Sequence, residues 1–279
     1  MVTTAAQDLE MCWQQLLASD TADGAHKFRV ATRRLRVVLH SLRREDERRF
    51  KDLRQSLAVV SRTAGRLRDF DVLIGEIIEP LLDAAAPPGC PVLLAQLIAE
   101  RRQTRAGICA ELDAPGMRKL RRGLPSLPHR LRHPRHAGHH RRALRKLARR
   151  DLKRRWRHFL HRADDLPALP PEHMHEARKS LKSLRYALAQ FAPVLDPVDV
   201  ARFHKRTLQL LDLFGYLNDV ESAKVLVARL EPAAAHVDVN CAIGYVLGTH
   251  TERARRARKK LAVRLKQLAA TRMARALDT

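Results

Sequence analysis

Apolar residues recur every three or four positions along most of this chain, which is the spacing of one face of an α-helix. Prolines and glycines separate the periodic stretches. The pattern predicts helices over residues 5–18, 25–44, 46–64, 67–84, 92–112, 138–162, 172–191, 198–213, 217–230 and 239–268. Because no stretch alternates apolar and polar residues as a half-buried strand does, the sequence predicts an all-α fold.

Two parts of the sequence, about 150 positions apart, repeat one another. The motif His-x-x-Arg-x-x-x-(Arg/Lys)-x-x-Arg occurs at 26–36 and at 175–185, and Gly-x-Leu-x-Asp follows at 65–69 and at 215–219. The order of elements also repeats: a helix with the basic motif, a further helix, then a Gly-x-Leu-x-Asp turn into a third. We therefore expect two similar antiparallel helical bundles, related by a pseudo-twofold axis, within one domain spanning 1–279. Their expected bounds are 5–123 and 138–270, joined by a basic link rich in Pro and His at 124–137.

Each basic motif forms a cationic stripe on one side of its helix. The first stripe lies within an arc of roughly 80° and contains His26, Arg29, Arg33, Arg36 and His40. The second contains His175, Arg178, Lys182 and Arg185. The opposite faces are apolar: Phe28, Ala31, Leu35, Val38, Leu39 and Leu42 in the first helix, and Ala177, Leu181, Leu184, Leu188 and Phe191 in the second. Guanidinium groups grip phosphate oxygens two at a time, and a helix N-terminus also favours an anion, so each stripe suits a phosphate-bearing partner.

An ordinary solvent-facing helix surface is the alternative interpretation of each stripe. Such surfaces usually interleave Glu among the cations, because like charges at these spacings repel one another. The retention of the same motif in two helices whose other residues differ favours a binding site over a solvated face.

The composition points to a polyanionic partner. The chain has 54 Lys plus Arg against 30 Asp plus Glu, a net charge of +24, and 45% of its residues are apolar, enough for a folded core. Nucleic acid, an anionic membrane surface and a phosphate polymer all fit this charge. Aromatic residues make up only 4% of the chain, whereas proteins that bind single-stranded nucleic acid stack bases on aromatic rings. The composition therefore favours a phosphate polymer.

Several classes of protein do not fit the sequence. No apolar run is long enough to span a bilayer, and the N-terminal residues do not resemble a secretory signal. The four cysteines are scattered singly, which argues against a disulfide framework or a thiolate zinc site. We therefore expect a reduced, cytoplasmic protein.

The paired motifs at 26–36 and 175–185, together with Leu67-Arg68-Asp69-Phe70-Asp71-Val72-Leu73 and Phe214-Gly215-Tyr216-Leu217-Asn218-Asp219, resemble those of the CHAD domain family over roughly residues 7–268. The resemblance implies two pseudo-symmetric helical bundles with a basic groove between them, which binds inorganic polyphosphate and brings the protein to polyphosphate granules. It implies that the groove is lined by His26, Arg29, Arg33, Arg36, His175, Arg178, Lys179, Lys182 and Arg185, with Arg54 and Lys205 added from the following helices. This sequence departs from the family where Leu208 and Leu211 stand in place of a Lys and a Gln, which would reduce that part of the groove.

Two further basic segments leave their role open. Residues 118–162 contain 18 Lys plus Arg and seven of the 14 His, with Asp151 as the only acid, and the C-terminal helix is also rich in Lys and Arg. Each is either an extension of the polyanion-binding surface or a solvated surface. A metal site at His133, His136, His139 and His140 is disfavoured, because the surrounding arginines repel a cation.

Carboxylates next to the Gly-x-Leu-x-Asp motifs raise the question of catalysis. Asp69 with Asp71, and Asp219 with Glu221, are better explained as acids that cap a helix start and bond basic neighbours. No cluster suited to holding Mg²⁺ for phosphoryl transfer is found. We therefore expect a non-enzymatic polyphosphate-binding protein on polyphosphate granules, with no cofactor or metal. A nucleic-acid-associated or chromosome-associated protein, with nucleic acid as a competing ligand, is the main alternative. A polyester-granule protein and a phosphatase or kinase acting on polyphosphate are also considered.

Overall fold

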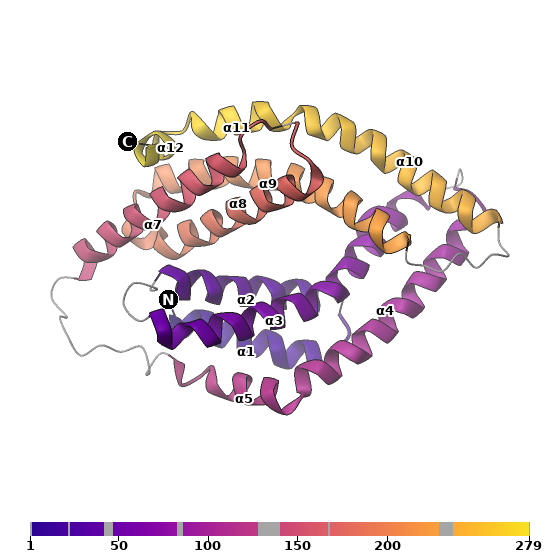
Figure 1. Ribbon diagram of the computed structural model, residues 1–279, viewed down its shortest axis with the longest axis horizontal. Helices are drawn as coiled ribbons and strands as arrows, with labels where there is room; N and C mark the ends of the chain where they lie inside the picture. The colour runs from indigo at the N-terminus through magenta and orange to yellow at the C-terminus, as the bar shows by residue number, and fades with distance from the viewer. Residues whose placement is uncertain are drawn as a thin grey trace. The chain divides into compact units, whose positions relative to one another are not determined.

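All regular structure in the described residues is helical, as the apolar spacing predicts (Figure 1). The computed structural model describes residues 2–21, 23–41, 47–82, 86–127, 140–166, 168–228 and 237–278. The helices of the N-terminal part are α1 (Val2–Ala18), α2 (Gly24–Ser41), α3 (Glu47–Val72), a π-helical turn (Leu73–Ile78), a 3-10 turn (Glu79–Leu81), α4 (Cys90–Asp113) and α5 (Pro115–Gly123). The later helices are α7 (His140–Arg162), α8 (Pro171–Phe191), a 3-10 turn (Ala192–Val194), α9 (Pro197–Val227), α10 (Val237–Lys259), α11 (Leu261–Ala269) and α12 (Arg272–Asp278).

The chain forms two compact units. Unit 1 consists of Met1–Arg132 and Ser222–Thr251, and unit 2 consists of His133–Glu221 and Glu252–Thr279. Residues 222–251, which the sequence repeat assigned to the second bundle, thus belong to unit 1. The pseudo-twofold relation and the groove between the repeats stay predictions.

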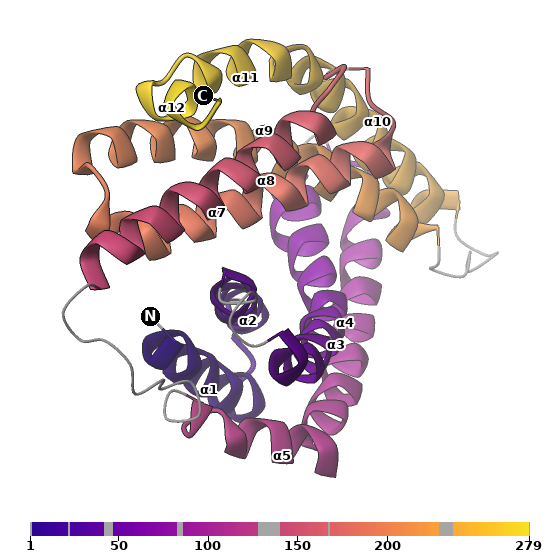
Figure 2. The ribbon, with the colours of Figure 1, turned by 60° about the vertical axis from the view of Figure 1, so that its left-hand side comes forward.

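The core of unit 1 is built on the apolar face predicted for α2. In this unit α1 packs on α2, α2 on α3, and α3 on α4 (Figure 2). Trp13 of α1 and Phe28 of α2 are fully buried and meet edge to face, with ring centroids 5.4 Å apart. The α2 residues of the predicted face that the structure describes, Phe28, Ala31, Leu35, Val38 and Leu39, are all buried. The burial of this face turns the basic residues of α2 away from the core.

Unit 2 is organised in the same way around α8. Helix α7 packs along α8, and α12 packs on α7. Trp156 of α7 is fully buried between Phe159 and Phe203, with ring centroids 5.7 Å and 5.8 Å away. Its indole Nε1 donates a hydrogen bond of 2.6 Å to Asp278 of α12, so the C-terminal helix is tied to this core. The predicted apolar face of α8, listed above, is also buried throughout.

The predicted turns at Gly65 and Gly215 are wrong. Helix α3 continues through Gly65 to Val72, and α9 continues through Gly215 to Val227, so each replaces two predicted helices. A glycine inside a helix costs only about 1 kcal/mol relative to alanine, which a long buried apolar face outweighs. Conversely, the helix predicted over 239–268 is broken at Lys260 into α10 and α11. The short helices α5 and α12 were not predicted.

Candidate functional site

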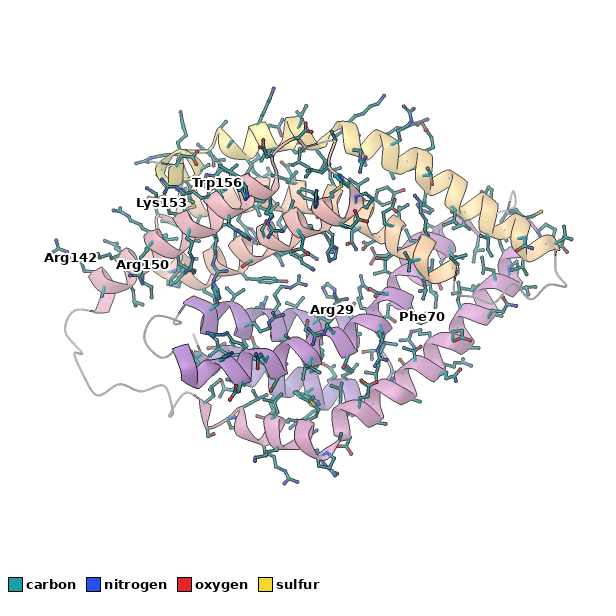
Figure 3. All side chains as sticks on the ribbon, in the orientation of Figure 1. Arg29, Phe70, Arg142, Arg150, Lys153 and Trp156 are labelled. Atoms are coloured by element: carbon teal, nitrogen blue, oxygen red, sulfur yellow. The ribbon has the colours of Figure 1, made fainter. Side chains whose placement is uncertain are left out.

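Helix α2 presents three half-buried arginines, Arg29, Arg33 and Arg36, which we call the α2 row. Arg29 (Figure 3) lies against α3, where its Nη1 is 3.8 Å from Asp69 Oδ1. Gly65 lies beside it, where a Cβ would make an ordinary contact of 3.8 Å with the Arg29 guanidinium carbon. His26, at the start of the motif, is exposed. The burial of the aliphatic stems therefore holds a series of guanidinium groups along one side of α2.

Helix α8 presents the equivalent residues Arg178, Lys182 and Arg185, which we call the α8 row; all three are half-buried. Arg178 Nη2 lies 3.9 Å from Asp219 Oδ1 of α9, and a Cβ on Gly215 would lie 3.9 Å from the same guanidinium. The Arg–Gly–Asp contact of unit 1 thus recurs in unit 2 at the positions that the sequence repeat matches. Lys179 is exposed and pairs with Glu176 of its own helix at 2.7 Å, so it is not part of this row.

The two histidines of the motif have different surroundings. His175 is half-buried, and its Nδ1 donates a hydrogen bond to Asn218 Oδ1. Burial, reinforced by the positive charges of Lys179 and Arg178, lowers the pKa of His175 below its ordinary value, although the Asn218 hydrogen bond acts in the opposite direction. In unit 1 the position that matches Asn218 is Arg68, and His26 is exposed. The surroundings of His175 therefore favour its neutral form.

Three arginines near the rows lie in surroundings that disfavour them, either by burial beside other cations or by leaving an N–H without an acceptor in the described part of the chain. Burial lowers the pKa of Arg36, and the positive charges of Arg33 and Arg62 lower it further. Among the described residues, Arg54 Nη1 and Arg185 Nε are buried donors without a hydrogen-bond partner. A buried N–H that has lost water without gaining an acceptor costs roughly 1–3 kcal/mol. An anion that contacts Arg54 in unit 1, or one that contacts Arg185 in unit 2, would remove this cost.

Lys205 and the adjacent His204 lie on different sides of α9, and His204 is the one on the side of Arg185 in the α8 row. The neighbouring His204 has its pKa lowered by burial and then by the positive charge of Arg185. Lys205 instead lines a cavity together with Arg202 and Arg206, and no residue of α8 lines that cavity. The sequence comparison missed His204, although a helical projection of α9 would have separated the faces of these adjacent residues.

Three more residues bear on the two rows: Arg62 of α3, and Leu208 and Leu211 of α9. Arg62 of α3, whose charge acts on Arg36, was not among the predicted residues. Leu211 is buried and Leu208 half-buried, so the positions where this sequence departs from the family carry no polar group.

The acids of the Gly-x-Leu-x-Asp motifs form ion pairs inside helices, and their expected role as caps of helix starts is wrong. Besides the two pairs described above, Asp71 is buried and accepts a hydrogen bond of 2.7 Å from Arg101 Nε. Burial raises the pKa of Asp71 although Arg101 opposes the shift, whereas the hydrogen bond from Arg101 lowers the pKa of the more exposed Asp20. Arg101 of α4 therefore joins Asp71 of α3 to Asp20, which follows the end of α1.

Other predicted features are only partly described. His133, His136 and His139 lie outside the described residues, as does most of the 124–137 link, and only the backbone of His140 is described. Arg142, Arg150 and Lys153 project from α7, where the first two are exposed (Figure 3). Among the residues with known placement, no three His, Cys, Asp or Glu side chains gather into a possible metal site. In the same ranges no helix combines the length and apolar character that crossing a membrane requires.

Comparisons with known proteins agree with this architecture. The CHAD domain family profile matches residues 1–228. The crystal structure of the CHAD domain from the plant Ricinus communis is similar, with a TM-score of 0.76 and 22% identity, covering 97% of this chain and 90% of that one. PptA from Streptomyces chartreusis is also similar, with a TM-score of 0.66 and 17% identity, covering 95% of this chain and 99% of that one. No curated protein matches the sequence. Since the family profile covers most of the chain, the protein belongs to the CHAD domain family.

Proposed function

We propose that the protein binds inorganic polyphosphate, without converting it chemically, through the α2 row and the α8 row. The observations that carry this proposal are the buried donors of Arg54 and Arg185, unpaired in the described ranges, and the burial of Arg36 beside other cations. Arg54 and Arg185 have buried donors that find no acceptor among the described residues, and Arg36 is crowded by other cations. A chain of phosphates supplies both oxygen acceptors and negative charge along the whole length of a row.

Polyphosphate suits the rows better than nucleic acid does. The aromatic side chains of the two helices, Phe28 in α2 and Tyr186 and Phe191 in α8, are buried, so they offer no surface on which bases could stack. Polyphosphate has no bases and asks only for a series of cations. Some members of the CHAD domain family are known to bind polyphosphate, which supports the same assignment.

The cellular role follows from this binding. A protein that holds long-chain polyphosphate without cleaving it would accumulate on polyphosphate granules, where it could target or scaffold other components. No partner protein is needed for this localisation, because the polymer itself is the docking surface. Fluorescence microscopy of a tagged protein, in cells that make polyphosphate and in cells that cannot, tests the granule assignment directly.

Titration with long-chain polyphosphate and with single-stranded DNA of equal phosphate content, at the same salt, tests the binding. We expect tighter binding of polyphosphate. Arg36→Gln with Arg185→Gln should weaken it by on the order of 10- to 100-fold, since each lost contact is worth about 1 kcal/mol or more. The two substitutions should leave the folded state as stable or more so, because they remove half-buried cations.

Lys259→Gln with Lys260→Gln is the matched control, because it removes the same charge from two exposed positions outside the rows. Equal losses in the two variants would mean diffuse attraction instead of a site. DNA binding as tight as polyphosphate binding would favour the nucleic-acid alternative. Release of phosphate during incubation with Mg²⁺ would show an enzyme.

A further inference from the structure

Unit 2 contains a second basic site, lined by residues of α9 and of the C-terminal helices α11 and α12. Figure 2 shows where these helices lie. It is a cavity of about 870 Å³. Five cations line it: Arg202, Lys205 and Arg206 from α9, and Arg272 and Arg275 at and after the start of α12. The carboxylate nearest to this group in the described contacts is that of Asp199, 3.8 Å from the largely exposed Arg272. The site thus carries a large excess of positive charge at a place that the polyphosphate proposal does not use.

The other lining residues make the cavity more than a charged surface. Pro197, Val198, Ala201 and Ala270 contribute apolar surface. Arg206 is held in place, because its Nη1 donates to Gln209 Oε1 at 3.1 Å and to Gln267 Oε1 at 3.3 Å. Gln267 Oε1 also accepts from Arg264 Nη1 at 2.9 Å, which fixes the amide. A fixed guanidinium beside apolar surface is preorganised for a ligand that has both an anionic and an apolar part.

We infer that this cavity binds a nucleoside polyphosphate. Its phosphates would lie among the Arg and Lys side chains, and its flat base would lie on the apolar surface beside a guanidinium plane. The volume falls within the usual range of ligand sites, roughly 300–1,000 Å³. A bare polyphosphate chain would make no use of the apolar surface. Because the lining includes no residue of α2 or α8, the site is separate from the two rows and does not rest on the proposed function.

Calorimetric titrations with ATP, inorganic tripolyphosphate and adenosine test the inference. ATP should bind at a single saturable site, about tenfold or more tighter than tripolyphosphate, because only ATP uses the apolar surface. Adenosine should bind more weakly than either.

Two variants distinguish the cavity from general charge. Arg202→Glu with Lys205→Glu reverses two of its cations, and Ala201→Trp fills it from an exposed helix position without changing any charge. Each should weaken ATP binding by about tenfold or more, while Ala201→Trp should leave long-chain polyphosphate binding unchanged. Arg149→Glu with Arg150→Glu, on the exposed side of α7, is the charge-matched control and should retain ATP binding.

Three results would overturn the inference: tripolyphosphate binding as tightly as ATP, Ala201→Trp binding ATP as the wild type does, or the α7 control losing as much affinity as the cavity variant. Far-ultraviolet circular dichroism, which the added tryptophan of Ala201→Trp leaves readable, verifies that each variant is folded. The charge-reversal variant and Ala201→Trp alter different properties of the cavity, so the inference stays testable if one of them does not fold.

Discussion

Asp69 and Asp219 hold equivalent arginines, yet their replacement by Asn should have unequal effects on stability. Asp219→Asn should lower the free energy of unfolding of unit 2 by about 2 kcal/mol, and Asp69→Asn that of unit 1 by about 0.5 kcal/mol. The N–O separations, 3.9 Å and 3.8 Å, are nearly the same, so distance does not distinguish the pairs.

Exposure to solvent makes the difference. The side chains of Arg178 and Asp219 are 16% and 19% exposed, whereas those of Arg29 and Asp69 are 28% and 52% exposed. Two unit charges at this distance attract by about 1 kcal/mol in water and about 4 kcal/mol at the effective dielectric constant near a protein surface. The attraction energy of the less exposed unit 2 pair lies between these two values, whereas that of the more exposed unit 1 pair is reduced by solvent screening to the lower value or below it. Both separations exceed a hydrogen bond, and the amide oxygen of Asn can still accept the 3.3 Å hydrogen bond that Asp219 Oδ1 accepts from Asn218 Nδ2, so Asn removes mainly the charge.

Urea unfolding followed by tryptophan fluorescence can measure each unit separately. The chain has two tryptophans, both fully buried: Trp13 in unit 1 and Trp156 in unit 2. In a Trp13→Phe background, Asp219→Asn should move the unit 2 midpoint by about 1 M, taking a slope of about 2 kcal/mol per M. In a Trp156→Phe background, Asp69→Asn should move the unit 1 midpoint by about a quarter of that. Equal shifts, or a larger shift for Asp69→Asn, would refute the role of exposure.

Three further predictions concern buried charge and helix packing. Arg101→Gln should destabilise unit 1 by about 3 kcal/mol near pH 7 and by less near pH 4. Burial raises the pKa of Asp71, and a carboxyl group with a raised pKa contributes stability at low pH that is lost as pH rises. Urea unfolding at both pH values checks this. Burial lowers the pKa of His175 below 6.5, so the stability that its neutral form contributes to unit 2 is full above that pH and is lost as pH falls. His175→Gln should therefore reduce the loss of unit 2 stability between about pH 7 and about pH 5. Gly215→Ala should stabilise the protein by about 0.5–1 kcal/mol and raise its melting temperature, because the new Cβ would make an ordinary contact of 3.9 Å. Gly89→Ala should lower the melting temperature, because its Cβ would lie 2.0 Å from a backbone oxygen. A lower melting temperature for Gly215→Ala would contradict this account.

The helices and their buried faces could be predicted because they depend on local spacing. The buried faces of α2 and α8 follow directly from apolar residues every three or four positions. The turns at Gly65 and Gly215 could not be judged in this way, since a glycine breaks a helix only when nothing else favours its continuation. Here each glycine lies where an arginine of the neighbouring helix crosses, which is a property of packing between segments far apart in the sequence.

The partners of the charged groups were the least predictable part of the site. Arg101 joins Asp20 and Asp71, which are 81 and 30 positions away, and nothing in the local sequence around Arg101 indicates either contact. Lys205 as a polyphosphate-binding residue stays a prediction. Adjacent helical positions differ by about 100°, so Lys205 and His204 face different sides of α9. His204, one residue earlier, is the neighbour of Arg185.

One contact recurs in both units at positions that the two motifs share. In each unit the first arginine lies against a glycine of the next helix, Gly65 or Gly215, and near an acid four residues later, one helical turn away. Arg36 and Arg185 also recur at matching positions. Burial and the charges of Arg33 and Arg62 lower the pKa of Arg36, and Arg185 keeps a buried Nε without a hydrogen-bond partner among the described residues, although its guanidinium lies 4.6 Å from the centre of the Tyr186 ring. The proposed polyphosphate binding would account for two half-buried arginines at these positions, because a phosphate supplies both an acceptor and a negative charge.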